Sequence, residues 1–203
     1  MAIIDKPSDY FNTVLYTGNG GTQSITGVGF QPDWTWIKPR STTGNHRITD
    51  AVRGATKQIY ADLTNAENTN TNGLTAFGTD GFTVGSDGGY NGNGVTLASW
   101  NWLGANGTSA NTDGTISSTV SANTTSGFSI VSYTGTGSAA TVGHGLGVAP
   151  KMIFNRTISA AKNWITYHAS LGATKFVELD TTDAAATSSD KFNNTEPTST
   201  VFS

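Results

Sequence analysis

The chain has 203 residues, of which 35% are hydrophobic, 10% aromatic and only 12% charged, with a net charge of −3 and no cysteine. The small net charge argues against a nucleic-acid-binding protein and, together with the aromatic content, against disorder. The lack of cysteine excludes disulfides and thiolate metal sites. No apolar run approaches the roughly 20 residues that span a bilayer, and no signal peptide is visible, so we expect no membrane insertion.

Short β-forming runs separated by turns rich in Gly and Asn indicate an all-β chain. Residues 13–16 form such a run, and the glycines and asparagine of residues 18–21 end it. Residues 34–38 alternate large apolar and polar side chains, as a half-buried strand does. The further strands predicted in this half of the chain are residues 46–50, 57–63, 81–85 and 95–103.

The second half of the chain repeats the first. Residues 11–20 return as residues 128–137, and residues 54–57 return as residues 172–175, at an offset near 117. The strands predicted in the second copy are residues 115–120, 128–133, 152–155, 164–168, 176–179 and 197–202. A fixed-period duplication of β units is more typical of a binding or structural array than of a single catalytic site.

The duplication predicts two tandem antiparallel β-sandwiches of jelly-roll or concanavalin-like type, the second one incomplete. We expect residues 1–104 to form the first repeat with an N-terminal arm, residues 105–114 a linker rich in Gly, Asn and Thr, and residues 115–203 the second repeat. Nothing in the second copy corresponds to residues 90–103, so its closing strand is missing. Either sequence beyond Ser203 or another chain would supply that strand, and the pattern favours continuation.

The N-terminal arm is a candidate for attachment to a neighbouring subunit. Ile3 and Ile4 open a short extended stretch that Pro7 interrupts, and Phe11 begins the first copy of the repeat. A short extended arm of this kind could fill a vacant strand position in another subunit. We therefore predict Ile3, Ile4 and Phe11 as residues for virion attachment or strand exchange.

No set of residues predicts catalysis. The three histidines, His46, His144 and His168, do not occupy equivalent positions in the two copies, and no Gly-x-Ser-x-Gly elbow is present. Glu178 and Asp180 are the single candidate carboxylate pair for glycoside hydrolysis, and the first copy has Tyr60 and Asp62 there. We predict a non-enzyme with no catalytic residue and no cofactor.

Two turns rich in Asp and Gly, at residues 79–81 and 87–91, loosely resemble oxygen-rich calcium loops. Their spacing differs from an EF-hand loop, and no glutamate closes them. Asp-Gly and Asn-Gly are also the commonest hairpin turns. Both interpretations of these segments, as calcium loops and as structural turns, therefore stay open. We favour structural turns and predict no metal ligand.

The tryptophans are the best candidates for binding. Trp34 and Trp36, like Trp100 and Trp102, stand two residues apart and so share a face of a strand. Such a pair could stack on sugars, but large aromatic residues also dominate cores, and we favour the core. Trp164 has no aromatic counterpart in the first copy, so we predict glycan binding at Trp164, with His46 and Arg47 as a polar rim.

Several segments carry a resemblance to a known family. They are residues 16–20, 27–38, 49–54, 123–135 and 142–150. These segments resemble a repeat family common in marine bacteriophage proteins, similar to tail-fibre or virion-surface proteins with concanavalin-like lectin or glucanase sandwiches. The resemblance covers nearly the whole chain and implies no active-site residue, because the family carries no firm catalytic motif.

The resulting interpretation is a non-enzymatic structural and adhesive component of a bacteriophage particle, a tail fibre or virion-surface protein that contacts host surface glycans. The expected partners are other virion proteins and further copies of the chain, as a trimer in a fibre. The expected location is the virion, assembled in the bacterial cytoplasm. Two alternatives stay open: a capsid decoration or cement protein, and a glycan hydrolase of the concanavalin-like class.

Overall fold

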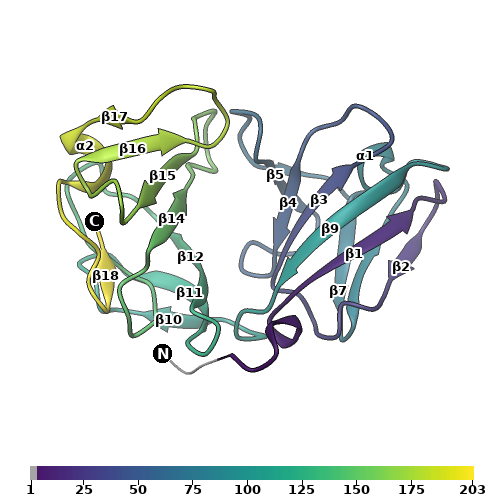
Figure 1. The fold of residues 1–203 in the computed structure, drawn as a ribbon, viewed down its shortest axis with the longest axis horizontal. Coiled ribbons are helices and arrows are strands. Elements are labelled where there is room, and N and C mark those ends of the chain that lie inside the picture. Colours follow the sequence, from purple (N-terminus) through teal and green to yellow (C-terminus); the bar gives the residue numbers. More distant parts are fainter. Residues whose placement is uncertain (1–3) are drawn as a thin grey trace.

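The computed structural model describes residues 4–203, a mostly β chain with several antiparallel sheets and three short helices in that range (Figure 1). The strands of the first repeat are β1 (Phe11–Thr17), β2 (Gln23–Ile25), β3 (Trp34–Pro39), β4 (Arg47–Asp50), β5 (Lys57–Tyr60), β6 (Asn68–Thr69), β7 (Leu74–Gly78), β8 (Gly81–Val84) and β9 (Thr96–Trp102). Its helical turns are η1 (Pro7–Asp9) and α1 (Gly88–Asn91). The all-β class predicted from the sequence is confirmed at this level.

The first repeat contains two sheets that share one core. The larger sheet has six strands in the order β1-β9-β3-β4-β5-β6, and the smaller has the order β2-β8-β7. Ile37 of β3 and Leu97 of β9 are fully buried, and they lie in one cluster with Ile25 of β2 and with Phe82 and Val84 of β8. Side chains alternate between the two faces of each strand, so one face of each sheet contributes its apolar side chains to a common core between the two sheets.

The second repeat is divided into smaller sheets. Its elements are β10 (Ser109–Asn111), β11 (Ser118–Asn123), β12 (Phe128–Tyr133), β13 (Val142–Gly143), β14 (Met152–Asn155), β15 (Ile165–His168), β16 (Lys175–Glu178), β17 (Ala186–Thr187), α2 (Ser189–Phe192) and β18 (Val201–Phe202). They pair as β10-β11-β12, β13-β18 and β14-β15-β16-β17. Its buried apolar cluster consists of Tyr167, Ala173 and Phe192, the last from α2.

The two repeats place corresponding strands in corresponding pairings. The hairpin-like series β3-β4-β5-β6 returns as β14-β15-β16-β17, and the pair β2-β8 returns as β13-β18. Side chains match as well: Tyr16 contacts Phe82 edge-on with ring centroids 6.3 Å apart, and Tyr133 contacts Phe202 in the same way at 6.0 Å. The sequence duplication is therefore a structural duplication.

Not every strand has a counterpart: β7 of the first repeat and β10 and β11 of the second have none, and neither has β9. In the first repeat β9 lies between β1 and β3 and pairs antiparallel with both. In the second repeat β12 and β14 stand in the places of β1 and β3, but each ends its own sheet on that side within residues 4–203. Among residues 4–203, no strand therefore lies between β12 and β14.

Several elements differ from the sequence-based expectations. Residues 105–114, expected as a linker, contain β10, and the polar loop at residues 65–73 contains β6. The strand expected at residues 197–202 is limited to Val201–Phe202, and the one at residues 115–120 is shifted to Ser118–Asn123. Partner strands explain these differences, because pairing rather than propensity fixes where short strands begin and end. Among residues 4–203, no helix is long and apolar enough to cross a membrane.

Candidate functional site: an aromatic face on the six-stranded sheet

The four paired tryptophans lie on the opposite face of the sheet from the core. In β3 the residues Thr35 and Ile37 are buried, whereas Trp34 and Trp36 are only half-buried. The expectation that these tryptophans form the core of the first repeat is therefore wrong. The smaller aliphatic residues and Phe82 already fill that core, and the strand alternation leaves the indole rings on the other side.

Strand register brings these rings into one patch. Trp34 is paired with Trp102, and Trp36 with Trp100, across the β3–β9 ladder. Phe11 of β1 lies opposite Trp102, and the two ring centroids are 4.7 Å apart. We name this patch the aromatic face and define it as Phe11, Trp34, Trp36, Trp100 and Trp102.

Contacts with Phe128 show that the aromatic face is turned toward the second repeat, which lies beside the first in Figure 1. Phe128 of β12 stacks on Trp102 with a 6.1 Å centroid separation and a 23° interplanar angle, and it meets Trp34 edge-on at 6.5 Å. At the β1 end of the same face, Phe11 and Leu15 remain 37% and 61% exposed. One side of the aromatic face is therefore covered and the other is accessible.

Trp164 is the ring that joins the two repeats. Its side chain is only 2% exposed and lies in a cluster with Ile48 and Ile59 of the first repeat. Its Nε1 donates a 2.7 Å hydrogen bond to the Tyr60 carbonyl, and the guanidinium of Arg156 lies 5.4 Å from its ring centroid. In this arrangement almost none of the ring is available to a sugar.

Backbone hydrogen bonds reinforce this junction. Arg156 donates to the carbonyls of Leu63, at 2.8 Å, and of Asn65. Lys162 N–H donates to the Thr64 carbonyl at 3.0 Å, and Glu67 N–H donates to the Ile158 carbonyl at 2.9 Å. Burial lowers the pKa of Arg156.

His46 and Arg47, the predicted polar rim, point to opposite sides of the sheet. His46 Nδ1 accepts a 2.9 Å hydrogen bond from Trp36 Nε1, so it belongs beside the aromatic face. Arg47 instead lies on the inner side, where its guanidinium is 5.5 Å from the ring centroid of Tyr90 and would clash with any side chain at Gly89. The structure does not bring Trp164, His46 and Arg47 together as one site.

Two carboxylates on the side of β4, Asp50 and Glu67, are engaged in ion pairs. Asp50, paired across the ladder with Trp34, binds Arg53 Nε at 2.6 Å, and Arg53 Nη1 binds Glu67 at 3.0 Å. Arg53 thus stands between the two acids and holds both. A glycosidase needs one free acid and one free base or nucleophile flanking the bond that breaks, and this arrangement offers neither.

Asp180 of the candidate pair Glu178–Asp180 holds the backbone. Its Oδ1 accepts a 2.9 Å hydrogen bond from the Trp164 N–H, just as Asp62 accepts one at 3.0 Å from the His46 N–H. Equivalent carboxylates of the two repeats therefore hold equivalent backbone positions: Asp180 binds the residue before β15, and Asp62 binds the residue before β4. This repeated role favours a structural function for Asp180.

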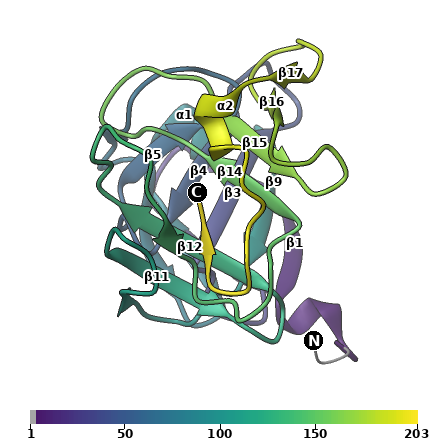
Figure 2. The same ribbon diagram turned by 90° about the vertical axis from the view of Figure 1, so that its left-hand side faces the viewer.

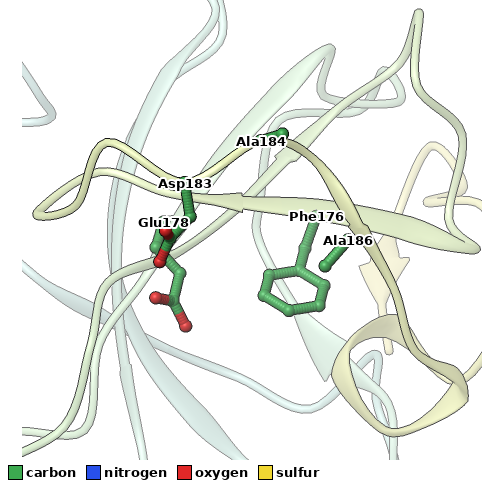
Figure 3. Close-up of a pocket in the computed structure, with 5 residues that line it drawn as sticks. All are labelled: Phe176, Glu178, Asp183, Ala184 and Ala186. Atoms are coloured by element: carbon green, nitrogen blue, oxygen red, sulfur yellow. The ribbon is translucent and has the colours of Figure 1, made fainter.

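Glu178 lines a small pocket in the second repeat (Figure 3). The pocket has a volume of about 260 Å³, and its other lining residues are Phe176, Asp183, Ala184 and Ala186. Glu178 and Asp183 lie at one end of it and Phe176 at the other (Figure 3). Glu178 also accepts a 2.8 Å hydrogen bond from Asn163, so it is a part of the local polar structure.

The turns that loosely resemble calcium loops use their carboxylates for backbone hydrogen bonds. Asp80 accepts from the N–H groups of Gly27 and Gly29, and these bonds lower its pKa. Asp87 caps α1 by accepting from the Gly89 N–H at 2.8 Å. Within residues 4–203, no group of three or more His, Cys, Asp or Glu is placed to hold a metal ion.

The remaining histidines and the N-terminal arm are placed as follows. His144 is buried, which lowers its pKa; its Nδ1 accepts from the Leu146 N–H, and its Nε2 lies 3.3 Å from the Thr198 carbonyl. His168 Nδ1 accepts from the Ser170 N–H. Ile3 lies outside the described residues, Ile4 is in no strand, and Phe11 belongs to the aromatic face.

Sequence reasoning did not identify Phe11 and Phe128 as neighbours of the tryptophans. The signal was present in the duplication, because Phe11 and Phe128 occupy the same position in the two copies. The sequence alone did not reveal the strand register that places Phe11 opposite Trp102. It also did not reveal how one repeat packs against the other.

Residues 6–203 match the family model described as a domain of unknown function, DUF7483, and the chain therefore belongs to this family. No curated protein and no solved structure matches the chain.

Proposed function

We propose that this member of the DUF7483 family is a non-enzymatic structural and adhesive component of a bacteriophage particle, a tail-fibre or virion-surface protein built from two sandwich-like repeats. The resemblance of its repeated segments to marine phage proteins supports the viral context. In this proposal the protein binds surface glycans of the host, and the partners are other virion proteins and further copies of the chain.

The observation that carries the adhesive role is the aromatic face. Its rings lie on the sheet face opposite the core of the first repeat. Trp34 and Trp36 pack against the Trp164 cluster, whereas Phe11 at the edge of the face is 37% exposed. A sugar ring presents an apolar face on which an aromatic ring can stack. Because Asp50 and Glu67 are held by Arg53, the face is suited to bind a glycan without cleaving it.

The test is binding of purified bacterial surface polysaccharides, measured by titration calorimetry and by tryptophan fluorescence. We expect Phe11→Ala to weaken binding about tenfold, which corresponds to the loss of about 1.4 kcal/mol from one stacking contact, because Phe11 is the exposed ring of the aromatic face. Leu15→Ala is the matched control, since it removes an exposed apolar side chain of the same sheet face without removing a ring. Equal binding by Phe11→Ala and the unmodified protein would disprove the proposed site.

Two further measurements separate the alternatives. Incubation of the protein with a bound polysaccharide should release no new reducing ends, and release that Glu178→Gln abolishes would establish a hydrolase instead. A cement protein would lie on the capsid, whereas a fibre protein would lie on the tail. Electron microscopy of phage particles in which this protein is labelled distinguishes the two locations.

A further inference from the structure

Among residues 4–203, the second repeat has no strand in the place that β9 holds in the first. The strand β12 pairs only with β11 on one side, and β14 pairs only with β15, in the part of the chain that the structure describes. Alternate N–H and C=O groups of each strand therefore point toward the space between them without a ladder partner. Free edges of this kind accept an added strand.

The two edges lie near each other. In the first repeat, β1 and β3 are separated by β9 alone, which is two strand spacings or about 10 Å. In the second repeat, Asn155 Nδ2 of β14 donates a 3.2 Å hydrogen bond to Tyr133 Oη of β12. At this point the two strands therefore lie within reach of two side chains.

Side chains next to this space are exposed where their counterparts are covered. Met152 and Phe154 of β14 are 49% and 43% exposed. Their counterparts in the first repeat, Trp34 and Trp36, are half-buried beside the β9 residues Trp102 and Trp100. The open position beside β14 therefore accounts for two of the four large apolar side chains that are exposed among residues 4–203.

We propose that the space between β12 and β14 is the acceptor site for one extended peptide strand with the chemistry of β9. The strand runs antiparallel to both neighbours. Its residues alternate between small or aliphatic side chains on the inner side, as Leu97, Ser99 and Asn101 do, and aromatic side chains on the outer side. By the register of the first repeat, its two aromatic residues lie opposite Met152 and Phe154.

The first repeat supplies the probe. A fluorescently labelled peptide with the sequence of residues 95–103 should bind the unmodified protein saturably and raise its melting temperature with peptide concentration. Amide signals that shift in NMR spectra of the ¹⁵N-labelled protein should map to β12 and β14. A peptide of the same composition in scrambled order, and one N-methylated at alternate backbone nitrogens, should bind roughly tenfold more weakly or worse, because they lose the pattern and the ladder bonds.

A pair of variants tests the position. Phe154→Lys puts a charge beside the proposed strand and should weaken binding, whereas Leu15→Lys, at an exposed position of β1, should leave it unchanged. Absence of saturable binding, shifts confined to the free edge of β1, or equal loss in both variants would overturn the proposal. Concentration-dependent dimerisation of the chain that the peptide does not reverse would also overturn it, since a second copy would then be the occupant.

Discussion

The first repeat holds β9 between β1 and β3, whereas no strand among residues 4–203 lies between β12 and β14, the corresponding strands of the second repeat. β9 joins its neighbours into one six-stranded sheet, while β12 and β14 belong to separate sheets. A central strand thus unites two groups of strands that are otherwise independent.

The second repeat compensates by packing on the first. Trp164, Phe128 and Arg156 all contact residues of the first repeat. The linker is held in the same way, because the buried Asp33 carboxylate accepts from the N–H groups of Gly104 and Asn106. We therefore expect the second repeat to depend on the first for its stability more than the first depends on the second.

The largest expected effect that tests this dependence is at Trp164. Trp164→Ala should lower the free energy of unfolding by about 3–5 kcal/mol, the usual cost of removing a buried tryptophan. It should also split urea unfolding into two transitions, the second repeat melting first. Trp164→Phe, which keeps an aromatic ring but loses the bond to the Tyr60 carbonyl, should cost less. A single unshifted transition in Trp164→Ala would contradict the dependence.

A second prediction contrasts the two faces of β3. Ile37 is fully buried in the core of the first repeat, so Ile37→Ala should cost about 2–5 kcal/mol. Its neighbour Trp36 is only half-buried on the aromatic face, so Trp36→Ala should cost nearer to about 1 kcal/mol, a typical value for point mutants. Chemical denaturation of both variants measures the difference. A larger loss in Trp36→Ala would return the tryptophans to the core.

A third prediction uses the carboxylate that the two repeats share. Asp62→Ala and Asp180→Ala each remove an acceptor from a backbone N–H, and each should cost about 1.5–3 kcal/mol, the range for hydrogen bonds to charged groups. Asp62→Asn and Asp180→Asn keep an oxygen acceptor and should cost less. Comparable losses in the two repeats would confirm a common structural role. A loss at only one of the positions would show that the roles have diverged.

The smallest expected effect concerns His46. Burial lowers the pKa of this histidine below its ordinary value of 6.5, and Nδ1 accepts the Trp36 indole N–H, so the folded state favours the neutral ring. The unfolded chain binds the proton more readily, so this contribution to stability is complete above about pH 6.5 and is lost as the pH falls through the folded-state pKa. His46→Asn, whose side-chain oxygen can accept the same bond, should reduce the loss of stability between pH 7 and pH 5.

His144 in the second repeat offers a further test of the pH dependence of stability. Its pKa is also lowered by burial, so the double substitution His46→Asn and His144→Asn should flatten the pH dependence further than either single change. Thermal melts at a series of pH values measure this. An unchanged profile in the double variant would mean that carboxylates alone set the acid sensitivity.

The sequence predicted most of the long strands because their side-chain alternation is local. Residues 34–38, 128–133 and 152–155 became β3, β12 and β14 with nearly the expected bounds. It missed the five-residue strand β7, and it did not predict β2, β6, β10, β13 or β17, which have only two or three residues. Strands this short carry no usable periodicity, and only their pairing partners define them.

The candidate site was predicted in part. Same-face pairing of Trp34 with Trp36 and of Trp100 with Trp102 follows from the two-residue period of a strand, and the structure has it. Which face of the sheet meets the core does not follow from that period, because both faces of β3 carry apolar residues. Burial of Trp164 likewise came from packing between the repeats, which no local pattern encodes.

By itself, the sequence determined the β class and the duplication, since these depend on composition, self-similarity and alternation along the chain. The tertiary structure alone decided that Ile37 and Leu97 face the core, that the tryptophans face the second repeat, and that Trp164 joins the two. These outcomes rest on contacts between residues far apart in sequence, such as Trp164 Nε1 with the Tyr60 carbonyl. The alternation along a strand divides its side chains between two faces. Which of the two faces is buried depends on the elements that pack against each face in the tertiary structure.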